Sequence, residues 1–287
     1  MRHISRGGLV RTVGLVVNTY ERTYRDVLSA GYFPQIAELN RRSFDEVVAL
    51  INNVDDAADA QRRAQALVDA GEITSYAFVR DLLPAALQHS GLGASALRRR
   101  PYLLDYGLVM PHAVATDWLL GWDAETTLDE PRDWVTEAIE LMERDPRVFH
   151  AGLNWHPMEE LDPGLASEAV ETIGDYALNY GFSDQLFLLR RQDLLDVRWR
   201  AFAPAAIVRH APHPYTFEFR VESHQRSVGR MRATRASLFY STRTSPAGVV
   251  DRTGATRLDR AQLRLLRALE HHIIRRVPRS TGPRWSL

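Results

Sequence analysis

The chain contains no cysteine and no lysine, and all 36 of its Lys and Arg positions are arginine. Without cysteine there is no thiol nucleophile, thiolate metal site or disulfide, so the redox compartment stays undetermined. Without lysine there is no P-loop lysine and no Schiff base or cofactor aldimine. The Gly-x-Ser-x-Gly, His-Glu-x-x-His and Gly-x-Gly-x-x-Gly motifs are also absent. These absences disfavour hydrolases and dehydrogenases.

Net charge and long hydrophobic runs are also lacking. The 36 acidic and 36 basic residues cancel, which removes the positive field typical of a nucleic-acid binder, so we expect no nucleic-acid partner. No stretch reaches the roughly 20 apolar residues that cross a bilayer. The apolar run at 13–17 is too short for a signal core and has no small-residue cleavage site, so we expect a cytoplasmic protein.

Short apolar runs alternate with amphipathic segments through the first half of the chain. This alternation predicts an α/β fold with a doubly wound, mostly parallel sheet flanked by helices, whose ligands gather at the carboxyl ends of strands. The length favours one large unit, residues 1–245, and a C-terminal extension, residues 246–287. The expected strands are 13–17, 44–51, 73–79 and 116–122, and the expected helices are 24–39, 57–70, 81–88 and 106–115.

The second half has a less regular pattern. A basic amphipathic helix is expected at 259–276. Three roles are open for it: packing on its own domain, pairing with a second subunit in a homodimer, or a peripheral contact with an anionic membrane. The loops 154–163 and 201–214 are expected to carry acceptor specificity. The remaining expected elements are helices at 133–144, 164–174 and 217–228, strands at 186–189 and 236–240, and a loop or hairpin at 249–258.

An acidic pair, Asp123 and Glu125, follows the apolar segment 116–122. Alternate residues of an extended segment point the same way, so both carboxylates can reach one hard cation. Oxygen ligands of this kind suit Mg²⁺ or Mn²⁺ bridging phosphate groups. The pair therefore predicts a divalent-metal site that holds a diphosphate.

The segment from Tyr102 to Thr127 resembles the GT-A glycosyltransferases, especially the family 2 type, in which a helix is followed by a strand ending in Asp-x-Asp. The resemblance extends from Val13 to about Tyr240, with Glu125 in place of the second aspartate. It implies a metal-dependent transferase that moves a sugar from a nucleotide diphosphate donor to an acceptor hydroxyl with inversion, and it implies a GT-A fold.

The resemblance also places residues around the donor. Thr19, Tyr20 and Glu21 match the nucleoside-contacting segment after the first strand. Asn53, Asp55 and Asp56 stand where the family usually has an acidic residue that reads the base, and Asn53 occupies the best-matching position, which leaves uridine, guanosine and thymidine diphosphates open. The residues expected near the sugar and diphosphate are Arg100, Asp105 and Asp123.

An inverting transferase needs a base for the acceptor hydroxyl. Glu218 matches the aspartate of the family's Glu-Asp helix by its spacing to Gly229, although Phe217 replaces the first acid. Asp184 matches a sugar-binding loop and is the alternative base. The family's later histidine ligand would fall at Tyr240, where there is none, so the remaining histidine candidates are His210, His213 and His224.

Two other functions share the expected fold. A sugar-nucleotide pyrophosphorylase needs a glycine-rich, basic loop after the first strand, and the segment from Asn18 to Arg22 has neither glycine nor lysine. A catalytically silent homologue that binds a sugar nucleotide or carbohydrate fits the altered Asp-x-Asp pair, the missing histidine and the incomplete Glu-Asp pair.

Overall fold

The computed structural model describes residues 11–97, 101–156, 169–210 and 215–242. In this part of the chain ten strands form one sheet, whose main path runs β3-β2-β1-β4-β9-β6-β10-β8-β7, with β5 paired to β10. The first four strands on this path are parallel to one another. The predicted α/β architecture, a sheet flanked by helices, is confirmed, and only β6 and β10 form a further parallel pair.

The N-terminal half follows the predicted alternation closely. Its helices begin and end within a few residues of the expected positions, because the apolar periodicity there matches what the fold buries. Its strands are β1 (Val13–Thr19), β2 (Glu46–Ile51), β3 (Ser75–Phe78) and β4 (Trp118–Asp123). Its helices are α1 (Tyr24–Val27), α2 (Tyr32–Leu39), α3 (Ala57–Asp69), α4 (Val79–Ser90), α5 (Asp105–Val109) and the 3₁₀ turns η1 (Ala94–Leu97), η2 (Pro101–Leu103) and η3 (Met110–His112).

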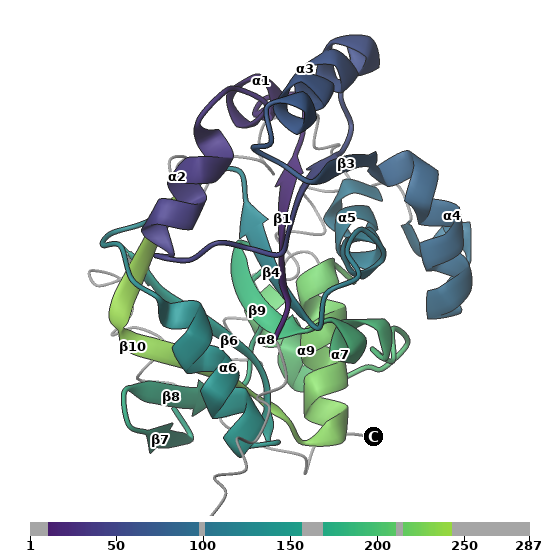
Figure 1. Ribbon diagram of the computed structural model, residues 1–287. Coiled ribbons are helices and arrows are strands. Elements are labelled where there is room, and N and C mark those ends of the chain that lie inside the picture. Colours follow the sequence, from purple (N-terminus) through teal and green to yellow (C-terminus); the bar gives the residue numbers. More distant parts are fainter. Residues whose placement is uncertain (1–10, 98–100, 157–168, 211–214, 243–287) are drawn as a thin grey trace, which may run out of the picture.

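The sheet is covered on both faces (Figure 1). Alternate residues of β1 belong to different cores: Leu15 and Val17 pack with α1, α2, α3 and α6 (Trp134–Arg144), whereas Val16 packs with α4, α5, α7 (Arg191–Leu195) and α9 (Phe217–Val228). A strand buried on both faces reads as a continuous apolar run, as β1 does. Figure 1 shows β1 and β4 in the middle of the molecule, with α9 beside the sheet.

The C-terminal half departs from the predictions. The helix expected at 164–174 is wrong in its described part, because Glu171–Ile173 form β7 and Gly174 makes the turn to β8 (Tyr176–Asn179). The predicted acceptor loop 154–163 begins inside a strand, β6 (Val148–His156), and the loop 201–214 contains α8 (Pro204–His210). The other strands are β5 (Thr126–Leu128), β9 (Leu186–Arg190) and β10 (Met231–Thr242).

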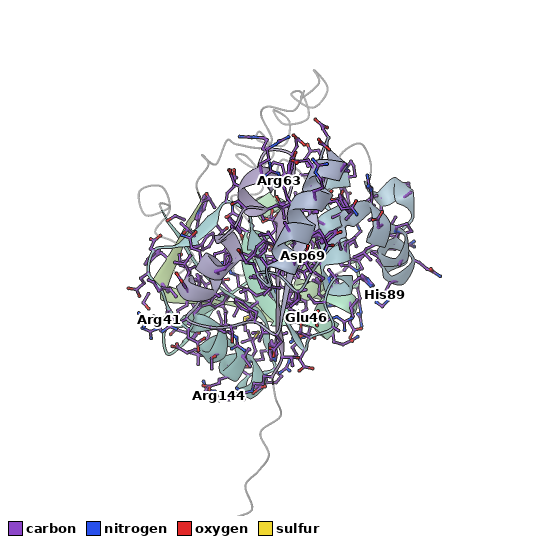
Figure 2. All side chains as sticks on the ribbon, turned by 45° about the horizontal axis from the view of Figure 1, so that its top comes forward. Arg41, Glu46, Arg63, Asp69, His89 and Arg144 are labelled. Atoms are coloured by element: carbon purple, nitrogen blue, oxygen red, sulfur yellow. The ribbon has the colours of Figure 1, made fainter. Side chains whose placement is uncertain are left out.

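Figure 2 labels several charged and polar residues of the surface. Arg41, His89 and Arg144 lie toward the edge of the molecule in this view and Asp69 nearer its middle, and all four are exposed. None of the helices in the described ranges combines the length and apolar character that a membrane span requires. The predicted extension 246–287, with the helix at 259–276, lies outside the described residues.

Candidate functional site

The candidate site lies where the strand order reverses. From β1 the chain builds outward through β2 and β3, and then returns to place β4 on the other side of β1. Ligands of open α/β sheets bind at the carboxyl ends of strands at such a switch point. At this point Asn18 of β1 is the register partner of Asp123, the last residue of β4.

Asp123 is held in place by two backbone contacts. Its own nitrogen donates to the carbonyl oxygen of Gln185 (2.8 Å), and its Oδ1 accepts from the nitrogen of Glu125 (2.9 Å). Burial, followed by the charge of Glu125, raises the pKa of Asp123 to about 6, although hydrogen bonds from the backbone of Glu125 and Ala124 act against this rise. Loss of water and a nearby like charge both disfavour the ionised carboxylate, so a cation would stabilise it.

Tyr20 lies close to the acidic pair. Its backbone nitrogen donates to the hydroxyl of Thr23 (3.1 Å), which in turn contacts the Thr19 hydroxyl at 3.1 Å. Burial raises the pKa of the Tyr20 hydroxyl to about 12, with further contributions from Glu125 and Asp123. The turn after β1 and the acids after β4 are thus brought together.

The predicted base-reading loop is tied to the turn after β1. The backbone nitrogen of Asp55 donates to Glu21 Oε2 (2.8 Å), and Arg25 donates to Glu21 Oε1 (3.1 Å). These two hydrogen bonds, that from Asp55 first, lower the pKa of Glu21. The Glu21 carboxylate therefore holds two loops together, and its nucleoside contact stays a prediction.

Asn52 is a residue that the sequence did not single out. It is buried at the end of β2, and its side-chain amide donates to Oδ1 of buried Asp105 (3.0 Å). Burial raises the pKa of Asp105, against hydrogen bonds from Asn52, the Tyr106 backbone and Asn53. Asn53 itself is exposed and has a left-handed backbone (φ 47°). The signal for Asn52 was its position directly after an apolar strand, next to the predicted Asn53.

The two candidate bases lie next to each other. The backbone nitrogen of Asp184 donates to Glu218 Oε1 (3.4 Å), and the hydroxyl of Tyr106 donates to Asp184 Oδ2. The pKa of Asp184 is raised well above its usual value by burial first and by the charge of Glu218 next, while the Tyr106 hydrogen bond opposes the rise. Asp123 also raises it. The acidic pair and both candidate bases therefore belong to one electrostatic cluster.

Glu218 owes its place to a helix start. Thr216 caps α9 by accepting from the backbone nitrogen of Phe219 (3.2 Å), and Gly229 ends the helix with a left-handed backbone (φ 68°). Capping hydroxyls and C-terminal glycines fix helix ends in this way. Glu218 therefore stands in the first turn of α9, as the spacing to Gly229 predicted.

A second polar group supports the loop that carries Asp184. The buried Tyr240 hydroxyl donates to Gln185 Oε1 (3.0 Å) and lies 3.3 Å from the Ser183 hydroxyl. The carbonyl of Gln185 accepts from Asp123 and from the Thr126 hydroxyl (3.3 Å). From the sequence, position 240 was of interest only because it lacks the family's histidine. In the structure, Tyr240 links β10 to the loop that carries Asp184.

The candidate histidine His224 is placed in the core. Its Nδ1 accepts from the backbone nitrogen of Arg198 (3.1 Å), and its ring contacts Phe149 edge-on at a centroid distance of 5.5 Å. Burial lowers its pKa to about 4, with Arg198 adding to the effect. His213 and the predicted Arg100 lie outside the described residues, as does the side chain of His210. No described group of three or more His, Asp or Glu side chains forms a metal cluster.

The residues present nevertheless fit a divalent cation. Asp123 and Glu125 would supply two carboxylates, and a Mg²⁺ or Mn²⁺ ion bound by one or two carboxylates completes its shell with water and phosphate oxygens. Among the described residues, the buried Asn18 Oδ1 and the Tyr20 hydroxyl have no hydrogen-bond partner. Asn18 is the register partner of Asp123, so a polar ligand bound at the acidic pair would supply hydrogen-bond partners for these two atoms.

The sequence matches none of the protein-family models and none of the curated proteins, whereas the fold is similar to several solved structures. GalNAc-T7 with UDP, GalNAc and Mn²⁺ is similar over 81% of this chain and 44% of its own, with 8% identity and a TM-score of 0.49. This chain therefore spans less than half of GalNAc-T7.

Two other solved structures are similar over most of this chain. Glucosyl-3-phosphoglycerate synthase from Mycobacterium tuberculosis, in complex with Mn²⁺, UDP and glucosyl-3-phosphoglycerate, covers 90% of this chain and 80% of its own (16% identity, TM-score 0.44). The mannosyltransferase PcManGT from Pyrobaculum calidifontis, with GDP-Man and Mn²⁺, covers 91% and 70% (13% identity, TM-score 0.46). At such identities the similarity concerns the fold alone and assigns no role to any side chain.

Proposed function

We propose that this protein is a GT-A-type glycosyltransferase that moves a sugar from a nucleoside diphosphate sugar to an acceptor hydroxyl with inversion, with Mn²⁺ or Mg²⁺ as cofactor. The observation that carries the proposal is the meeting of four acidic side chains at the switch point of the sheet. Asp123 and Glu125 follow β4, whereas Asp184 and Glu218 come from the loop before β9 and from α9.

The donor binds, in this proposal, across the carboxyl ends of β1, β2 and β4. Tyr20 packs against the nucleoside or its ribose, and the Asn52–Asp105 pair presents a fixed polar edge to it. Asp123 and Glu125 would hold the divalent ion, which neutralises the departing diphosphate when it is bound. Thr19 is buried and supports the turn through Thr23, so its role is to shape the site.

The acceptor side carries the proton chemistry. The acceptor oxygen attacks the anomeric carbon, the bond from that carbon to the diphosphate oxygen breaks, and the acceptor proton passes to a carboxylate. Two adjacent carboxyl groups cannot easily both ionise. Burial and the charge of Glu218 raise the pKa of Asp184, and we assign the role of base to Glu218 by its position in the first turn of α9.

Binding is tested first, by thermal denaturation with UDP, GDP or dTDP in the presence of Mn²⁺. We expect one nucleotide to raise the melting temperature of the wild type and to have no such effect on Asp123→Ala. Glu130→Ala is the matched control, because Glu130 is an exposed carboxylate on the same segment. A shift that survives in Asp123→Ala would count against the proposed site.

Turnover separates the proposal from its alternative. A transferase hydrolyses its sugar nucleotide slowly in Mn²⁺ without an acceptor, whereas a catalytically silent homologue binds the nucleotide without turnover. Sugar nucleotides that carry the base identified by the binding screen are therefore incubated with the protein in Mn²⁺ and, separately, in EDTA. Release of nucleoside diphosphate in Mn²⁺ but not in EDTA supports the transferase. Binding of the sugar nucleotide without any release supports the silent homologue.

A further inference from the structure

Three consecutive residues at the start of α5 each contact a different part of the candidate site. Asp105 accepts from Asn52 at the end of β2, on the side proposed for the nucleotide. The hydroxyl of Tyr106 donates a hydrogen bond to Asp184 Oδ2, on the side proposed for the acceptor. Gly107 lies against the ring of Phe217, the first residue of α9. This turn therefore joins the donor half of the site to the catalytic half.

Tyr106 is a buried residue in which ring and hydroxyl have separate partners. Its ring packs edge-on against Phe217, with 5.6 Å between centroids, and the side chain is only 8% exposed. The packing needs only a six-membered ring, which phenylalanine would also provide. The hydroxyl has a different function, because burial and the charge of Asp184 raise its pKa far above 10 and keep it a hydrogen-bond donor.

We propose that Tyr106 is a positioning residue that fixes the Asp184 carboxyl group beside Glu218 and thereby orients the base for the acceptor hydroxyl. The proposal rests on the proposed function and names a residue that acts through another side chain. The carboxyl of Asp184 is held at Oδ2 by Tyr106, and its backbone nitrogen is held by Glu218 Oε1 at 3.4 Å. Catalytic bases require such orientation, since small misplacements of a reacting group lower the rate steeply.

The substitution that isolates the hydroxyl is Tyr106→Phe. It keeps the ring against Phe217 and removes one hydrogen bond to Asp184. We expect kcat for transfer to fall by about tenfold or more, because a correctly placed base contributes roughly 10²- to 10⁴-fold. The donor KM should change by less than about twofold, since in this proposal Tyr106 affects the chemical step and not the binding of the donor. Tyr76→Phe is the matched control, because Tyr76 lies on β3 at the end of the sheet and its hydroxyl contacts the exposed Gln65 side chain at 3.5 Å.

A double-mutant cycle decides whether Tyr106 acts through Asp184. If it does, adding Tyr106→Phe to Asp184→Asn lowers kcat by less than about twofold further, because the group to be positioned is already altered. A structural role would give reductions that multiply. If Tyr106→Phe does not fold, Asp184→Asn alone still bears on the proposal, which requires its kcat to fall with the donor KM preserved.

The outcomes divide cleanly. A lower kcat, a preserved donor KM and a non-multiplicative cycle support the proposal. It is overturned by an unchanged kcat in Tyr106→Phe, by an effect on donor KM alone, by multiplicative effects in the cycle, or by an Asp184→Asn variant with unchanged kcat. A wild-type protein that neither binds nor turns over a sugar nucleotide would overturn the proposed function as well, whereas an active wild type with an inert Tyr106→Phe substitution overturns this inference alone.

Discussion

The backbone nitrogen of Asp123 donates a 2.8 Å hydrogen bond to the carbonyl oxygen of Gln185. This bond joins the strand that delivers the acidic pair to the loop that carries Asp184. The pairing of β4 with β9, from Trp118 opposite Arg190 to Trp122 opposite Leu186, extends the same connection. A change on one side of the site should therefore affect the other side.

The affinity of the protein for Mn²⁺ should weaken as the pH is lowered from 8 to 5. The pKa of Asp123 is about 6 in the metal-free protein, and a carboxylate must lose its proton to bind a metal ion. At pH 5 most of the protein carries that proton, so Mn²⁺ should bind about tenfold more weakly than at pH 8. Isothermal titration of Mn²⁺ with the preferred nucleoside diphosphate measures this. Equal affinity at both pH values would contradict the assignment of Asp123.

Asp184→Asn should stabilise the ligand-free protein in a pH-dependent way. A carboxyl whose folded pKa is raised binds more protons in the folded than in the unfolded state, so its contribution to stability falls as the pH rises above about 3.9. The raised pKa of Asp184 thus predicts a gain in melting temperature over the wild type that is larger at pH 8 than at pH 4. Asp81→Asn, at an exposed carboxylate, is the control. A gain of the same size at both pH values would contradict the prediction.

Gly107→Ala should destabilise the packing between α5 and α9. A Cβ at this position would lie 2.3 Å from the ring of Phe217, which is buried between α5 and the sheet. Overpacking of this kind costs about 1–3 kcal/mol of unfolding free energy. Gly93→Ala is the control, because the nearest atom to its added Cβ is a serine hydroxyl at 3.7 Å. Urea denaturation compares the two, and equal midpoints would contradict the close packing.

His224 should stay neutral over the physiological range. Its pKa of about 4, below the ordinary value, means that the unfolded state binds the proton more readily. Its contribution to stability is therefore complete above about pH 6.5 and is lost as the pH falls toward 4. The imidazole resonances in NMR spectra follow this titration directly. A midpoint near 6.5, or line broadening of His224 by Mn²⁺ at the site, would show that the ring is accessible.

The sequence predicted the half of the fold in which each strand is a plain apolar run. β1 and β4 are buried on both faces, so their apolar composition alone marks them as strands. Asp56, Gly71 and Gly229 lie at helix ends, where such residues are common caps. Because β1 and β4 are neighbours, Tyr20 and Asp123, which follow or end these strands, lie at the same edge of the sheet.

The other half was harder because it buries polar side chains. β6 carries His150 and Asn154, and β10 carries Arg232, Thr234 and Arg235, all of which are buried. These residues interrupt the apolar pattern that marks a strand, so β6 was missed and β10 was predicted too short. Their partners come from distant segments, as when Gln225 of α9 contacts His150 at 2.8 Å. The site contacts of Asn52 and Tyr106 were hidden for the same reason.

The central claim is that Asp123 and Glu125 hold the ion that clamps a nucleoside diphosphate. Its most direct test is a crystal structure of the protein with Mn²⁺ and the preferred nucleoside diphosphate, in which anomalous scattering locates the ion. The account predicts a manganese peak within about 2–2.5 Å of a carboxylate oxygen of this pair, with the diphosphate on its other side. A manganese peak remote from both residues, with the nucleotide elsewhere, would contradict it.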